Sequence, residues 1–321
     1  MSSRFVRLVR PASLAAAVAV AAASPAVAQS NDADAAAGLP PIDSLLPSND
    51  PWSFSAAYTW QDDEPVTRGG SLGIQRANTR LGYRTQIDQD TTLDLGLNYR
   101  FDGYDFSDTT VFDDTWGDVH SLSLTARFQW TVADEWTVFA GPIFEYSGES
   151  GAAFSDSITG GGYIGATYQA GNDLLLGFGV GAIGELEDDV RFIPIIVIDW
   201  DIIEGWKLSS RTSAATTGDT AIELIWDVSE NWDVAAGVSL FGKRRFRLDN
   251  DGAVPGGVGE EETRALTFRG TYTVSDAVDL SVFGGLKFES DIELEDNSGQ
   301  RVDKEDHDEA LFLGVSLSVR F

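Results

Sequence analysis

Basic side chains recur on one face of several alternating stretches in this 321-residue chain. Arg76, Arg80 and Arg84 are a clear case, because a spacing of four keeps all three on the same side of an extended strand. Rings of Lys and Arg around a water-filled passage favour anions. The residues that we expect to line such a passage are Arg76, Arg80, Arg84, Arg100, Arg127, Lys207, Arg211, Lys243, Arg245, Arg247, Arg269 and Lys287, together with Arg191 and Arg320.

Acidic residues share that inner face and leave a second interpretation open. The inner acids that we expect are Asp94, Asp102, Glu145, Glu223, Asp227 and Glu289. Charge is costly on a lipid-facing surface, so both signs turn inward whatever the function. The same side chains could therefore line an open passage or close it as ion pairs.

Two acidic stretches could hold metal ions. Asp291–Glu309 contains nine carboxylates, and Asp249-Asn250-Asp251-Gly252 is a turn with two more. Hard oxygen ligands suit Ca²⁺, but neither stretch has the ligand and glycine spacing of an EF-hand loop. We therefore expect no cofactor and no specific metal site, and at most divalent cations held loosely at acidic loops.

Few residues are suited to catalysis. The chain has no Cys, and its two histidines are His120 and His307. Nucleophilic hydrolysis needs a His that is positioned beside a Ser and an acid. No such set can be placed on matching strand ends, so we expect no enzymatic activity.

Residues 1–28 have the parts of a cleavable signal peptide. Three arginines precede a short apolar run, which ends in the small-residue sequence Ala26-Val27-Ala28. Removing this segment takes the formal net charge from −29 to −32, because it carries three positive charges and no acid. So acidic a chain is repelled by phosphate backbones, which excludes nucleic acid as a partner. Residues 29–51 are rich in Ala, Asp and Pro and are expected to form a flexible periplasmic lead-in, with a segment that plugs the barrel as the alternative.

From Trp52 onward, apolar and polar residues alternate. Successive side chains of a strand point to opposite faces, so this pattern predicts strands with one apolar face. No later stretch has about 18 consecutive apolar residues, so any membrane crossing is made by strands. We predict fourteen strands, with twelve or sixteen as alternatives, at 52–60, 71–87, 91–101, 119–132, 136–146, 157–168, 174–186, 190–200, 206–215, 220–228, 232–248, 262–274, 278–292 and 309–321.

The connections between these strands also alternate. Three-residue turns such as Asp88–Asp90 and Ala133–Glu135 come between longer acidic loops such as 102–118, 249–261 and 293–308. Short turns on one side and long loops on the other are typical of outer-membrane barrels. Thr217–Asp219 is the exception, because it is short where a long loop is expected.

Tryptophans mark one membrane boundary. Pairs six residues apart straddle three short turns. Indole rings prefer the headgroup level, so we expect a periplasmic aromatic girdle. Its members are Trp130, Trp136, Trp200, Trp206, Trp226 and Trp232.

The last segment alternates from Glu309 and ends the chain at Phe321. Here the sequence resembles the bacterial outer-membrane β-barrel proteins, whose final strand alternates and ends in an aromatic residue. The resemblance implies that this strand, with Phe321, is the signal read by the barrel assembly machinery. The stretch Arg191–Trp200 (RFIPIIVIDW) also resembles a set of such barrels of unknown function, from which no functional residue can be transferred.

These observations predict an all-β protein, a transmembrane antiparallel β-barrel over residues 52–321. We expect it in the outer membrane of a Gram-negative-type bacterium, surrounded by lipid and exported through the general secretory route. The expected function is a passive channel for small polar or anionic solutes. A non-conducting structural or adhesive barrel with acidic loops stays open as an alternative, and so does a transporter of apolar substrates with a plugged lumen.

Overall fold

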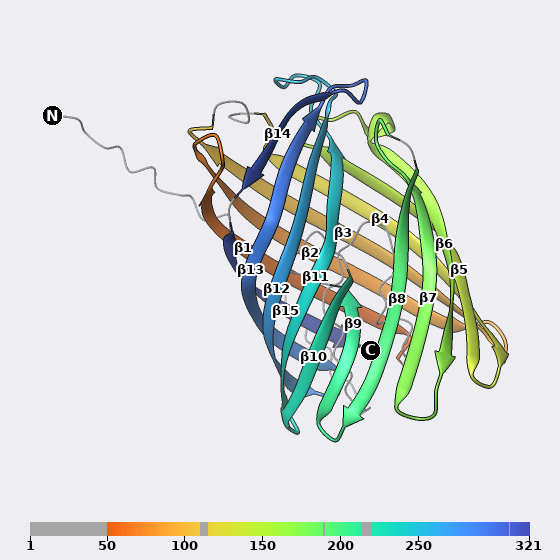
Figure 1. The fold of residues 1–321 in the computed structure, drawn as a ribbon. Helices are drawn as coiled ribbons and strands as arrows, with labels where there is room; N and C mark the ends of the chain where they lie inside the picture. The colour runs from red at the N-terminus through yellow and green to blue at the C-terminus, as the bar shows by residue number, and fades with distance from the viewer. Residues whose placement is uncertain (1–49, 110–114, 189, 213–219, 308) are drawn as a thin grey trace.

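The computed structural model describes residues 50–109, 115–188, 190–212, 220–307 and 309–321 (Figure 1). The expected signal peptide (1–28) and lead-in (29–51) lie outside these residues, apart from Asp50 and Pro51. Thr217–Asp219, the short connection that departed from the loop pattern, also lies outside them. Within the described residues, no helix is long and apolar enough to cross a membrane.

The chain folds into a closed antiparallel barrel in which each strand up to β13 pairs with the next along the chain. The sheet closes where β1 pairs with β15, for instance Ala56 with Leu317. The strands are β1 (Trp52–Pro65), β2 (Ser71–Gln86), β3 (Thr91–Ser107), β4 (Asp118–Ala133), β5 (Trp136–Glu149), β6 (Ile158–Gln169), β7 (Leu174–Gly184), β8 (Val190–Ile203), β9 (Trp206–Thr212), β10 (Thr220–Ser229), β11 (Trp232–Arg247), β12 (Val258–Ser275), β13 (Val278–Glu295), β14 (Arg301–His307) and β15 (Ala310–Arg320).

The barrel has fourteen strands because β14 and β15 are two parts of one interrupted strand. Both pair antiparallel with β13, where Ser290 faces His307 and Lys287 faces Ala310. The expected loop 293–308 is therefore largely a β-hairpin. Hydrogen bonds from Ser298 and Gln300 stabilise its turn and lower the pKa of the Asp296 carboxyl.

Two other expected loops are also shorter than the sequence suggested. Strand β3 continues to Ser107 and β12 begins at Val258, so much of 102–118 and the end of 249–261 belong to strands. Asp and Glu are uncommon in strands, so the acidic residues of these extensions led to the prediction of loops. The extensions carry the barrel wall beyond the apolar belt on the extracellular side.

Alternation along each strand separates an apolar outer surface from a charged inner one. On β3, Leu95 is 43% exposed on the outer face, whereas Arg100 and Asp102 on the inner face are buried. A belt of such exposed apolar side chains is the surface that lipid covers. The prediction of a transmembrane barrel is thus confirmed.

Replacing Leu95 by Arg is expected to destabilise the barrel by about 2–4 kcal/mol, because it puts a charge against lipid. Asn98→Arg on the inner face of the same strand is the matched control and should cost much less. Heat-modifiable gel migration of the two refolded variants measures the difference. Equal melting temperatures for the two variants would contradict the assignment of Leu95 to the lipid-facing side and Asn98 to the inner side of β3.

The strands are unequal in length at the extracellular end (Figure 1). The β9–β10 hairpin is short, and long β8 and β11 stand on either side of it. Above this hairpin β11 leans across the barrel and reaches β5, where Arg247 bridges to Gly148 in parallel. The extracellular end is thereby narrowed to a smaller ring of strands.

Candidate functional site

Ion pairs between neighbouring strands lie along the inner wall of the lower lumen. Asp94 on β3 accepts hydrogen bonds from Arg84 at 2.5 Å, Arg127 at 3.0 Å and Gln129 at 2.7 Å. Arg84 and Arg127 lie on the inner face, as the alternation predicted. Their charges are paired with the Asp94 carboxylate.

Three further inner cations have acidic partners. The closest nitrogen–oxygen distances are 2.8 Å for Arg269–Glu223, 3.2 Å for Arg320–Asp279 and 3.3 Å for Lys207–Asp199. Arg80 lies over Gly96 on the same inner surface. The side chain of Arg211 lies outside the described residues.

A buried charge cluster lies higher in the lumen, centred on Glu261 of β12. Arg76 from β2 donates to its carboxylate at 2.5 and 2.7 Å, and the Tyr104 hydroxyl donates at 2.7 Å. Lys287 of β13 lies 3.7 Å away. These contacts join β12 to β2 and β3 across the strands of the barrel seam, so they narrow the passage.

Asp102 on β3 holds the other half of this cluster. Its carboxylate pairs with Arg100 at 3.3 Å and with Arg244, which reaches across from β11 and also donates to Ser121 at 2.8 Å. All these charged side chains are at most 6% exposed. The charge cluster therefore joins four cations to two carboxylates.

An apolar cap closes the lumen above the charge cluster. Its side chains come from β2, β3, β4, β11 and β13 and from their connections, and all are buried: Val66, Leu72, Ile74, Tyr104, Trp116, Val119, Phe246, Leu248, Ile292 and Leu294. The Trp116 and Phe246 rings meet edge to face at 5.5 Å between centroids. Within the described residues, these apolar side chains pack closely across the axis at this level.

Hydrogen bonds to Glu149 at the end of β5 hold the cap in place. Its carboxylate accepts from the backbone N–H groups of Gly117 and Asp249, both at 2.9 Å. This one side chain links the segments that enter β4 and leave β11. The narrowed ring is thus tied together where β11 meets β5.

An apolar wall covers the inner face of β5–β8 below the cap. Phe139, Ile143, Tyr163, Ile183, Ile195 and Val197 form it, with Leu175 and Ile193 packed against them. Phe139 lies flat on the sheet, because Gly165 opposite has no Cβ to obstruct the ring. The lumen is thus charged on one side and apolar on the other.

A β-bulge turns Lys243, Arg245 and Arg247 away from the barrel axis and towards the β7–β8 connection, so their lining of an open lumen stays a prediction. The register of β11 against β12 shifts between Ser239 and Gly242, which exchanges the two faces of the strand. Arg244 consequently points to the barrel axis, and its neighbours point to the opposite face. The three consecutive basic residues Lys243, Arg244 and Arg245 do not alternate with apolar ones, so the pattern contains no sign of this exchange.

The basic residues displaced by the bulge hold the β7–β8 connection. Arg245 donates to the Leu186 carbonyl at 2.8 Å and pairs with Glu260 at 2.5 Å, and Arg247 pairs with Glu187 at 2.7 Å. Lys243 approaches Glu185 at 3.7 Å. These contacts fasten β8 to β11 above the short β9–β10 hairpin.

Arg245→Met is expected to release this connection, because it removes the hydrogen bond to Leu186 and three ion pairs, one of them to Asp188 in the connection itself. Cleavage after Glu185 or Glu187 by a glutamate-specific protease should become faster, while Arg301→Met on exposed β14 should leave the rate unchanged. A wild-type cleavage rate for Arg245→Met would show that the connection is held by other contacts.

The six girdle tryptophans lie at one end of the barrel, each exposed on the outer face. Trp206 and Trp226 stack at 5.6 Å. Phe321 is also exposed, and its backbone exchanges two hydrogen bonds with Trp52 at the barrel seam. Headgroup contact by the tryptophans and recognition of Phe321 by the assembly machinery stay predictions.

No group of three or more His, Cys, Asp or Glu residues in the described part of the chain is arranged to hold a metal ion. Loose binding of divalent cations at the acidic loops stays a prediction.

Comparisons with known proteins support the fold. No family model and no curated protein matches the sequence. A FadL homologue from Pseudomonas aeruginosa has a TM-score of 0.50 at 12% identity, with 93% of this chain and 100% of that chain covered. An outer membrane channel from Pseudomonas putida F1 has a TM-score of 0.48 at 12% identity, covering 86% and 97%. The P. putida toluene transporter TodX has a TM-score of 0.41 at 12% identity, covering 87% and 92%.

The fold is therefore that of the outer-membrane barrels, as the sequence predicted, and the apolar belt places the chain in an outer membrane.

Proposed function

We propose that this protein is a gated outer-membrane channel for small molecules with an apolar body. The observation that carries the proposal is the combination of an apolar cap over the axis with an apolar wall below it. A general diffusion pore needs a water-filled bore, whereas close-packed side chains and ion pairs fill the upper lumen here.

The likeness to a FadL homologue supports a channel fold but names no solute for this chain. The anion channel that the sequence suggested is supported less well, because its inner cations have acidic partners. Arg84, Arg127, Arg269 and Arg320 all pair with luminal carboxylates. Neutralised in this way, they present little net charge to a passing anion.

Uptake into cells that lack their own general pores tests the proposal. Cells that produce the protein should accumulate radiolabelled naphthalene faster than cells with an empty vector, while entry of a sugar of similar size stays unchanged. Equal acceleration of the sugar would show an open aqueous pore. No acceleration of either would favour a non-conducting surface barrel.

A further inference from the structure

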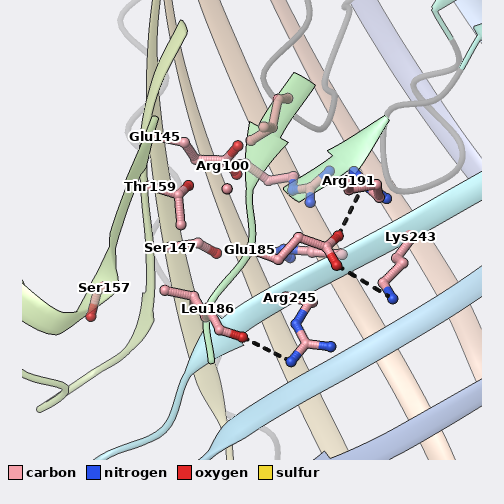
Figure 2. Close-up of a pocket in the computed structure, with 13 residues that line it drawn as sticks. Arg100, Glu145, Ser147, Ser157, Thr159, Glu185, Leu186, Arg191, Lys243 and Arg245 are labelled. Atoms are coloured by element: carbon pink, nitrogen blue, oxygen red, sulfur yellow. Dashed lines mark hydrogen bonds and ion pairs between the residues drawn. The ribbon is translucent and has the colours of Figure 1, made fainter. Parts of the chain in front are cut away.

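A pocket lies between β11 and the inner faces of β5–β8, beside the charge cluster and below the β7–β8 connection. Figure 2 shows its lining, with Glu145 and Thr159 on one side and Arg191 and Lys243 on the other. This is the space that β11 leaves when it crosses the barrel to reach β5. Its lining belongs neither to the apolar cap nor to the outer surface.

The lining is mainly basic. Five cations reach it, Arg100, Arg191, Lys243, Arg244 and Arg245, against two acids, Glu145 and Glu185. The other carboxylates that partner these cations, Asp102, Asp188, Glu260 and Glu295, are not part of the lining. Coulomb interactions fall with distance, so the nearer cations dominate inside the pocket.

Arg191 is the cation best placed to meet a ligand. Its guanidinium pairs with Glu185 at 3.0 Å from one nitrogen, a contact that Figure 2 marks with a dashed line. A guanidinium binds a carboxylate through two parallel N–H groups. Lys243 lies 3.7 Å from the same Glu185, and its closer partner is Glu260 at 3.0 Å, which is outside the lining.

The pocket continues into the apolar wall. Ile183 belongs to both, and Leu186 also lines the pocket. On β5 the inner residue changes from Glu145 to Ile143 over two positions towards the periplasm, and on β8 it changes from Arg191 to Ile193. A ligand that fits this boundary has a charged group above and an apolar body below.

We propose that this pocket, with a free volume of about 40 Å³, binds the carboxylate of a small monocarboxylate whose apolar body extends below it along the apolar wall, against Ile183 and Ile193. The inference deepens the proposed function and rests on it, because it names the class of molecule that the channel selects. The basic lining holds the carboxylate, and the apolar wall favours a ring or short chain over a free inorganic anion.

Isothermal titration of the refolded protein in detergent with benzoate tests the site. Benzoate should bind, whereas benzyl alcohol and inorganic phosphate should bind much more weakly. Arg191→Gln should weaken benzoate binding about tenfold or more, since a hydrogen bond to a charged group contributes that much. Glu145→Gln should strengthen it, because a facing negative charge is removed.

Arg301→Gln on exposed β14 is the control and should leave binding unchanged. Absence of benzoate binding by folded protein, or equal loss in Arg191→Gln and Arg301→Gln, would overturn the site. Phosphate binding as tight as benzoate would reject the monocarboxylate and indicate a bare oxyanion site. Naphthalene uptake separates the two proposals: uptake without benzoate binding overturns this site alone, and binding without uptake overturns the channel function alone.

Discussion

Shortening Trp116 and Phe246 to alanine together is expected to open the barrel along its axis. Both rings are buried in the apolar cap and contact each other, and Phe246 also packs against Tyr104 at 5.8 Å. Loss of a buried aromatic ring costs about 3–5 kcal/mol. Destabilising the closed form by even ~3 kcal/mol raises the open population about a hundredfold.

Liposome swelling with sugars of increasing size measures this opening. The double variant should admit sugars that the wild type excludes. Phe192→Ala with Phe268→Ala is the matched control, because these rings are 71% and 57% exposed on the outer face. If the folded cap variant swells no faster than this control, the axis is closed somewhere other than at the cap.

Glu261→Gln is expected to lower the melting temperature of the barrel more than any other single change of charge in the upper lumen. The carboxylate is buried and holds Arg76, Tyr104 and Lys287. Removing its charge leaves four cations facing Asp102 alone. Breaking a buried pair by removing one partner costs about 3–5 kcal/mol.

The transition of heat-modifiable migration gives this effect directly. Glu135→Gln in the exposed β4–β5 turn is the control, and a surface change of this kind should stay within about 0.5 kcal/mol. A Glu261→Gln barrel that melts with the control would mean that the charge cluster is solvated and adds little to stability.

The strands and their facing were readable from the sequence because the side-chain period of a strand is two. The pattern placed Arg84, Arg100 and Arg127 on the inner face, and the structure has them there. The residues of the apolar wall and the apolar cap also follow the period of two along their strands. Leu72 and Ile74 share the parity of Arg76, so an apolar stretch on the inner face could have been found.

Other features left no such trace. The bulge after Ser239 falls before the run Lys243-Arg244-Arg245, in which either face is basic, so Arg244 was missed. Strand β14 is hidden because Asp and Lys disfavour strands by themselves. Its pairing with β13 includes Glu293 opposite Lys304 and Asp291 opposite Asp306, a register set by tertiary context.

The crossing of β11 to β5 is also invisible in the sequence. It depends on the short β9–β10 hairpin and on contacts such as Glu149 with Asp249, which join positions a hundred residues apart. The pocket beside the charge cluster exists because of that crossing. Fold and facing were therefore predictable, but the crossing of β11 and the packing of the cap across the axis were not.

Single-channel recording of the wild-type protein in a planar bilayer tests the central claim, that the axis is closed by the cap and the charge cluster. Folding is verified first by heat-modifiable migration. The closed axis predicts no steady open current from folded protein, and steady steps once Trp116 and Phe246 are both alanine. Steady open steps from the wild type would contradict the closed lumen and restore the simple anion pore.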